Sequence, residues 1–139
     1  MTDQDFAPAA TAGDIEIPIA VLAEAVHAVL KTCDVQVGLK LDVVDQPIDP
    51  REAKLELGSN IALSSETDRW NLSVMADERS CQVFTRYFFD MGVDDGVAME
   101  DVADAMGEIV NVAAGVFKAK RVEAGENIYI GLPLFMLGT

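Results

Sequence analysis

The sequence has few of the side chains that bind transition metals or nucleic acids. Its 139 residues include one His, two Cys and ten Lys and Arg residues against 24 Asp and Glu residues, so the formal net charge is −14. His27, Cys33 and Cys81 show no metal-ligand spacing, and we expect no protein-bound transition metal. Since the negative charge repels phosphate backbones and anionic lipid headgroups, the composition argues against nucleic acid and membrane surfaces as partners.

Segments for targeting or membrane insertion are missing too. The longest apolar runs are far too short to cross a bilayer, and no N-terminal stretch joins basic residues to an apolar run as in a secretory signal. We therefore expect a cytoplasmic protein with reduced cysteines. Familiar catalytic sets are also absent, because the sequence has no G-x-x-x-x-G-K-S/T loop and no Ser or Cys nucleophile with an evident base.

The residues that are present indicate one folded domain. Half of them are hydrophobic, which argues against a disordered chain, and the length suits a single core. Residues 1–13 are small, polar and without period, so they are predicted to form a disordered tail. Residues 14–139 then make up the domain, in which we find no internal repeat.

Hydrophobic periodicity predicts a helix near the start of the domain and a longer one near its end. The first runs from Pro18, which suits a first helical turn, to about Lys31, and His27 borders its apolar stripe as a partly buried structural residue. The long helix covers about residues 99–121. Its end carries basic residues, which complement the helix dipole more simply than they form an anion site; these are Lys118, Lys120 and Arg121.

A third helix is predicted over residues 78–91. Asp77 precedes it as an N-cap, and Gly92 follows it as a C-cap glycine. Its apolar side chains recur at helical spacing, so the core is expected to include Cys81, Val83, Phe84, Tyr87, Phe88 and Met91.

Strands are predicted between these helices and after them. Residues 35–44 alternate and are β-branched, which is typical of a strand. Residues 54–63 and 69–76 are predicted to form an antiparallel hairpin across a set of turn-forming residues. Shorter extended segments follow at about 127–130 and 132–137. This order of elements predicts an α+β fold, a mostly antiparallel sheet with helices over a face.

The long helix has an organised polar face. At about 100° per residue, five of its residues fall within an arc of roughly 80°, namely Asp104, Glu108, Asn111, Gly115 and Lys118. Apolar residues that include Ile109 and Val110 fall on the opposite side. Asn is a poor interior helix former, because its amide competes for backbone hydrogen bonds. Glu108 and Asn111 make a two-pronged surface that another protein could receive, although E-x-x-N alone is equally typical of a solvated helix face.

The wider sequence context favours a partner-binding face. The run D-A-M-G-E-I-V-N-V-A-A-G, followed by a hairpin-like stretch and G-L-P, resembles the CheC/CheX/FliY family of chemotaxis phosphatases. That family has an Asp or Ser, three residues, a Glu, two residues and an Asn, with a Pro further on. The matching residues here are Asp104, Glu108, Asn111 and Pro133. This sequence contains one such motif and therefore resembles the CheX branch, because CheC and FliY contain two.

The resemblance implies a CheX-like α+β fold with a long motif-bearing helix and two further helices. It also implies a phosphatase that hydrolyses the aspartyl phosphate on a CheY-like receiver domain of a response regulator. The receiver would supply Mg²⁺ and a Lys, so this chain itself needs no bound cofactor. Asn111 would then orient the attacking water, and Glu108 would pair with the receiver's Lys.

The residues around this pair are expected to dock the partner. Asp104 and Lys118 would form the rim, and Gly115, which lies on the polar arc itself, would permit close approach. Gly107 also has minimal bulk, but tight packing inside the domain explains that residue nearly as well.

Two other function classes stay open. One is a binding module that captures phosphorylated receivers without hydrolysing them, and the other is a structural component of an assembly such as the flagellar switch. CheX-like chains usually continue with further strands after the Pro-containing segment, whereas this sequence stops at Thr139. Because an apolar edge at residues 134–137 invites association, we expect a homodimer.

Overall fold

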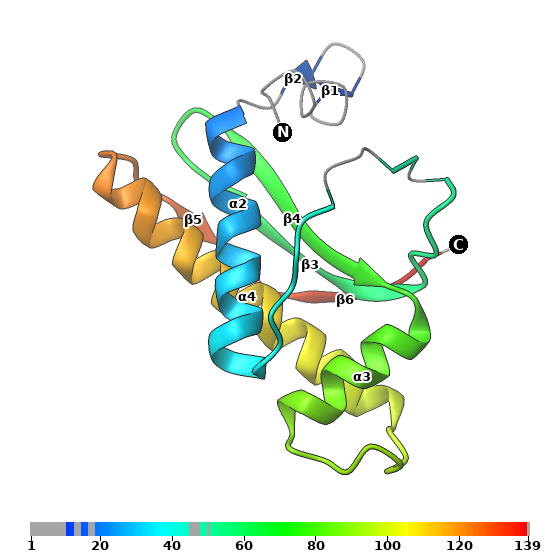
Figure 1. Cartoon of the computed structure of the whole chain (residues 1–139). Coiled ribbons are helices and arrows are strands. Elements are labelled where there is room, and N and C mark those ends of the chain that lie inside the picture. Colours follow the sequence, from blue (N-terminus) through cyan, green and yellow to red (C-terminus); the bar gives the residue numbers. More distant parts are fainter. Residues whose placement is uncertain (1–10, 13–14, 17–18, 45–47, 50, 139) are drawn as a thin grey trace.

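The computed structural model describes residues 11–12, 15–16, 19–44, 48–49 and 51–138. Within these ranges, three α-helices pack against a small antiparallel sheet (Figure 1), which confirms the predicted α+β fold. None of the described helices is long and apolar enough to span a membrane. The elements in chain order are β1 (Thr11–Ala12), β2 (Ile15–Glu16), α2 (Ile19–Thr32), η1 (Cys33–Val37), β3 (Leu57–Ser64), β4 (Arg69–Ala76), α3 (Glu78–Phe88), α4 (Met99–Glu123), β5 (Tyr129–Ile130) and β6 (Leu134–Leu137).

The main sheet is built around β3. Strand β4 pairs with one edge of β3 along its whole length, from Leu57 opposite Ala76 to Ser64 opposite Arg69. The predicted hairpin is therefore confirmed, although its first strand begins three residues later than expected. Strands β5 and β6 lie end to end along the other edge of β3. Pro133 falls in the gap between them, where a residue without a backbone N–H does not interrupt the ladder.

Helix α4 is the central element of the core, and its position confirms the predicted long helix. It lies against the sheet and contacts both α2 and α3 (Figure 1). Near its end, the Phe117 ring meets Trp70 of β4 edge-on, with 6.0 Å between ring centroids. Eight of its side chains are buried, and these are Val102, Ala105, Met106, Ile109, Val110, Ala113, Ala114 and Phe117. This continuous buried stripe fixes which face of α4 points to solvent.

The predicted strand over residues 35–44 is wrong. Helix α2 continues directly into η1, a π-helical turn, and residues 38–44 pair with no strand in the described part of the chain. Cys33 and Val37 are both buried, whereas Val35 between them is exposed. Gly38 then ends the turn with a φ of +78°, a conformation that glycine adopts at little cost. The first residues of the predicted strand are therefore helical, and the buried ones recur at the spacing of a helical turn and not at every second position.

Helix α3 starts as predicted but ends earlier. Its N-cap is Asp77, whose carboxylate accepts a hydrogen bond from the Ser80 N–H at 2.7 Å. The helix ends at Phe88 instead of Met91, and the predicted C-cap at Gly92 is wrong. Asp90 takes the left-handed conformation with a φ of +53°, which Asp tolerates better than most residues.

The predicted core face of α3 is only partly correct. Cys81 is buried, and Phe84 and Phe88 are half-buried against the core. Val83 and Tyr87, which were expected in the core, are 38% and 54% exposed. Apolar residues extend around more of this short helix than its neighbours cover, so periodicity alone did not identify the buried side.

Helix α2 keeps close to its predicted bounds and lies alongside α4. Arg121 at the end of α4 holds the two helices together, because its Nη1 lies 3.0 Å from Glu24 Oε2 on α2. Arg121 also forms an ion pair with Glu126, just after α4. His27 on α2 was expected to be partly buried, but it is exposed, because α2 and α4 leave a groove between them at this level.

The predicted tail falls mostly on residues that lie outside the described ranges. Residues 1–10 and 13 are among them. Near the end of the predicted tail, Thr11 and Ala12 pair with Glu16 and Ile15 of the domain, so β1 and β2 form a two-stranded ladder that the sequence did not predict.

Candidate active site

The solvent face of α4 carries the polar residues that the sequence placed on one arc. All five are exposed, namely Asp104, Glu108, Asn111, Gly115 and Lys118. Directly beneath them, Ile109 is 1% exposed and Val110 and Ala113 are fully buried. The predicted division of α4 into a polar and an apolar side is confirmed.

Glu108 and Asn111 are held by the helix and not by contacts of their own side chains. Among the described residues, no hydrogen bond or ion pair engages either side chain. The two residues between them, Ile109 and Val110, are anchored in the core. A fixed backbone thus presents a free carboxylate and a free amide, one helical turn apart, to an external partner.

The two glycines of this face have different surroundings. Gly107 is half-buried, and a Cβ there would lie 3.7 Å from the Cβ of Pro133. The structure therefore brings Pro133, which follows Asn111 by more than twenty residues in the sequence, against the helical turn that precedes Asn111. Gly115 is exposed, and a Cβ there would meet no atom within 4 Å. Pro133 therefore covers Gly107 at an ordinary van der Waals distance, whereas the space above Gly115 is open.

The two cysteines lie away from this face. Both are free thiols with no exposed side-chain surface. Burial raises the pKa of Cys33, and burial is also the largest cause that raises the pKa of Cys81. The nucleophilic thiolate form is therefore disfavoured at both positions. Within the described ranges, no three His, Cys, Asp or Glu side chains gather into a group that could hold a metal ion.

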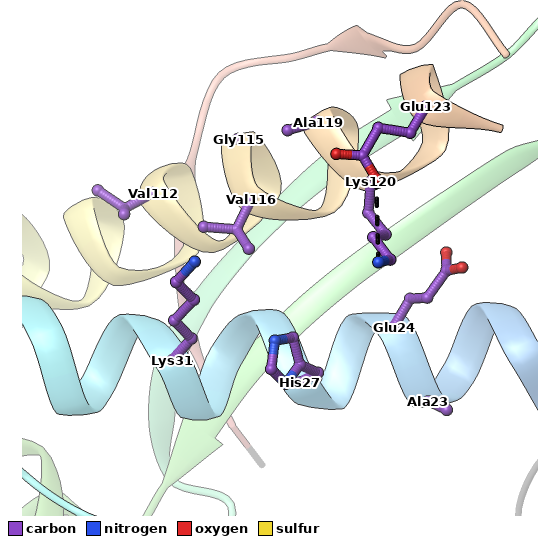
Figure 2. A pocket seen from close by; sticks show the side chains of 10 residues that line it. All are labelled: Ala23, Glu24, His27, Lys31, Val112, Gly115, Val116, Ala119, Lys120 and Glu123. Carbon is purple, nitrogen blue, oxygen red and sulfur yellow. Dashed lines mark ion pairs between the residues drawn. The ribbon is translucent and has the colours of Figure 1, made fainter. Parts of the chain in front are cut away.

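A groove between α2 and α4 adjoins this face, and the sequence did not predict it. Lys31 and His27 on α2 face Val112 and Val116 on α4, and Gly115 also lines the groove (Figure 2). The only indication of this groove in the sequence was that His27 borders the apolar stripe of the first predicted helix. Which residues of a second helix would lie opposite it depends on how the two helices pack, and local periodicity does not contain that information.

A known protein family matches the part of the chain that carries this face. The family described as chemotaxis phosphatase CheX matches residues 57–139, a span that includes all of α4 and Pro133. No curated protein matches the sequence significantly.

Solved structures of chemotaxis proteins share the fold. CheX from Vibrio vulnificus is 20% identical with a TM-score of 0.71, over 86% of this chain and 75% of its own. A CheC-like protein from Shewanella oneidensis is 18% identical with a TM-score of 0.74, over 88% of this chain and 80% of its own. The CheX–CheY–BeF₃–Mg²⁺ complex from Borrelia burgdorferi contains a chain that is 16% identical with a TM-score of 0.63, over 88% and 79% of the two chains. The family match spans more than half of the sequence and includes Glu108 and Asn111, so this chain belongs to the CheX chemotaxis phosphatase family.

Proposed function

We propose that this chain accelerates the hydrolysis of the aspartyl phosphate on a CheY-like receiver domain. The observation that carries the proposal is the exposed pair Glu108 and Asn111 on the solvent face of α4, above the buried Ile109 and Val110. Because neither side chain forms a described hydrogen bond or ion pair and the helix backbone beneath them is anchored in the core, Glu108 and Asn111 are suited to insertion into a partner's site. The related CheX of Borrelia burgdorferi forms a complex with CheY, BeF₃ and Mg²⁺, which supports a receiver domain as the partner of this chain.

In this proposal Asn111 positions the attacking water. The water oxygen forms a new bond to phosphorus, while the bond between phosphorus and the aspartyl oxygen breaks and its electron pair stays on the receiver's carboxylate. The protons of the water pass to phosphate and solvent. The amide of Asn111 has both a donor and an acceptor, so it can orient the water without changing its own protonation. A glutamine amide has this task in some GTPases.

Glu108 has the docking role in the same proposal. Its carboxylate pairs with the receiver's Lys and thereby fixes the position of α4 over the phosphoryl group. A charge pair that loses its water at an interface contributes more to binding and register than a surface ion pair does. Asp104 and Lys118 lie on the rim, and the open space above Gly115 allows the partner to approach the helix closely.

The phosphoryl group belongs to the receiver in this scheme, and the Mg²⁺ that neutralises its developing charge is bound there as well. The residues of this chain then contribute orientation, register and exclusion of bulk water, which lower the barrier without a covalent intermediate on this chain.

The test is phosphate release from a phosphorylated receiver. A CheY-like receiver domain from the same organism is phosphorylated with acetyl phosphate and Mg²⁺, the donor is removed, and release is followed with and without the chain. We expect the rate to rise in proportion to the concentration of the chain. Binding to the BeF₃-loaded receiver without faster release would instead support the non-catalytic binding module, and absence of both would exclude receivers of this kind as substrates.

A further inference from the structure

The groove between α2 and α4 is a second feature of the face that contains Asn111. It has a volume of about 940 Å³, which is large enough to receive side chains of a partner. Its walls are the half-buried Val112 and Val116 of α4 and the exposed His27 and Lys31 of α2 (Figure 2). Figure 2 shows the Lys31 side chain directed from α2 toward α4, across the opening.

The groove is continuous with the proposed site. Val112 directly follows Asn111, and Gly115, one turn further on, belongs both to the solvent face and to the groove lining. Because Gly115 has no side chain and nothing lies within 4 Å of where its Cβ would be, no barrier separates the two. A partner seated on Asn111 therefore has open access to the groove.

Cations gather at this end of the molecule although the chain as a whole is strongly acidic. Lys31 and Lys120 line the groove together with the only His of the sequence and with Glu24 and Glu123, while Arg121 and Lys118 lie on the same part of α4. Arg121 is neutralised by Glu24 and Glu126, and Lys120 lies 3.9 Å from Glu123. Lys31 and Lys118 are exposed, and neither has an ion-pair partner among the described residues.

A partner that binds Mg²⁺ and phosphate presents an acidic surface, because carboxylates are the ligands that hold Mg²⁺. A chain with a net charge of −14 repels such a surface at long range, unless cations lie close to the point of contact. Lys31 lines the groove together with Gly115, and Lys118 is exposed on the same face of α4 as Asn111, so these two lysines supply that local compensation.

We propose that the groove between α2 and α4 is the second half of the docking surface, and that it takes the acidic rim beside the receiver's phosphorylation site. This inference rests on the proposed function. Lys31 attracts the acidic rim, Val112 and Val116 contact apolar side chains next to it, and Gly115 leaves the passage open. The groove thus determines which receivers bind well, while Asn111 acts on those that have bound.

The experiment compares two charge reversals that change the net charge equally. Lys31→Glu reverses the cation of the groove, whereas Lys40→Glu reverses an exposed lysine that does not line it. Steady-state dephosphorylation is measured over a range of phosphorylated receiver concentrations, and the Kd is measured with the same receiver loaded with BeF₃ and Mg²⁺. Lys31→Arg serves as the conservative variant, and thermal melting checks that each variant is folded.

We expect Lys31→Glu to raise KM and Kd about tenfold at low salt with little change in kcat, and this difference to shrink in about 0.5 M salt. Lys40→Glu and Lys31→Arg should remain close to the unmodified chain. If Lys31→Glu and Lys40→Glu behave alike while the unmodified chain dephosphorylates the receiver, the groove inference is overturned and the proposed function stands. If the unmodified chain neither binds nor dephosphorylates the receiver, both are overturned.

Discussion

Glu108 and Asn111 lie one turn apart on the same exposed face, yet their proposed roles differ in when each acts. Glu108 meets a charge that is present before and during the reaction, so it contributes to binding. Asn111 meets a water that is correctly placed only as the reaction proceeds, so it contributes to rate. Single substitutions at the two positions should therefore have separable effects.

Replacing Asn111 with Ala should lower kcat by about 100-fold, because a misplaced nucleophile costs at least that much. The Kd for a BeF₃-loaded receiver should change little, and the melting temperature should not fall, because the side chain is exposed and has no internal contact. The matched control is Asn71→Ala, which removes an exposed Asn on β4. Turnover by Asn111→Ala at the rate of the unmodified chain would show that the catalytic assignment is wrong.

Replacing Glu108 with Ala should raise the Kd for the receiver by about 30-fold or more, because it leaves the receiver's Lys unpaired at the interface. The loss of kcat/KM should follow mainly from KM, which steady-state rates at several receiver concentrations can show. Glu66→Ala, in the exposed turn between β3 and β4, removes the same charge elsewhere and should have no effect. Unchanged affinity in Glu108→Ala would contradict the docking role.

The start of α3 shows how one side chain affects a whole element. The Asp77 carboxylate accepts the Ser80 N–H at 2.7 Å, and hydrogen bonding to the side chain and then to the backbone of Ser80 lowers the pKa of Asp77 below its usual value. The ionised carboxylate therefore stabilises the folded chain above the unfolded pKa of about 3.9. That contribution is lost as the pH falls through the lower, folded pKa.

Asp77→Ala should accordingly lower the melting temperature at neutral pH, and the difference from the unmodified chain should shrink as the pH falls through the lowered, folded pKa and the carboxyl becomes protonated in both states. Asp77→Asn is the matched variant, because Asn also caps helices but does not titrate. Melting curves followed by circular dichroism from neutral to acidic pH give the comparison. A difference that grows as the pH falls would contradict this account of the cap.

In α4, Gly115 is a residue that weakens the helix. Glycine in a helix interior costs roughly 0.5–1 kcal/mol relative to alanine, and a Cβ at Gly115 would meet nothing within 4 Å. Gly115→Ala should therefore stabilise the fold by about 0.5–1 kcal/mol in urea unfolding. Gly58→Ala is the contrasting variant and should destabilise the fold, since its Cβ would collide with the Val74 carbonyl and Met75. Loss of stability in Gly115→Ala would show that the space above it is not open.

At the scale of the whole molecule, two groups of core residues meet on α4. One group joins α2 and the sheet to the second half of α4, with Ile61 and Phe117 among its largest members. The other joins η1 and α3 to the first half, around Met106 and Ile109. Glu108 and Asn111 lie where the two halves of α4 meet, so both groups of core residues support the face that contains this pair.

The outer edge of β6 leads to a proposal about assembly. In the described chain this strand pairs only with β3, and Leu134 and Leu137 are 64% and 69% exposed. We propose that a second copy covers this edge, because an open apolar strand edge is prone to association. Light scattering at high protein concentration should give twice the mass of one chain, and Leu134→Glu should halve it. Val93→Glu, in an exposed turn, should leave the mass unchanged, and a single-chain mass for the unmodified protein would contradict the dimer.

Local patterns in the sequence were sufficient to predict the secondary-structure elements that carry the proposed site. The long run of helical periodicity predicted α4, and the same periodicity separated the exposed Glu108 and Asn111 from the buried Ile109 and Val110. The hairpin of β3 and β4 and the cap at Asp77 were also predictable. Each of these depends on residues close together in the chain, whose spacing already contains the geometry.

Other features were decided only by tertiary packing. Residues 33–37 continue α2 because Cys33 and Val37 find buried positions beside α3 and α4, and the apolar side of α3 that faces solvent depends on where α4 lies. The exposure of His27 and the groove that it shares with Lys31, Val112 and Val116 arise from how two helices distant in sequence pack together. A side chain's periodicity shows which neighbours share its face, but burial depends on what the rest of the chain places against that face.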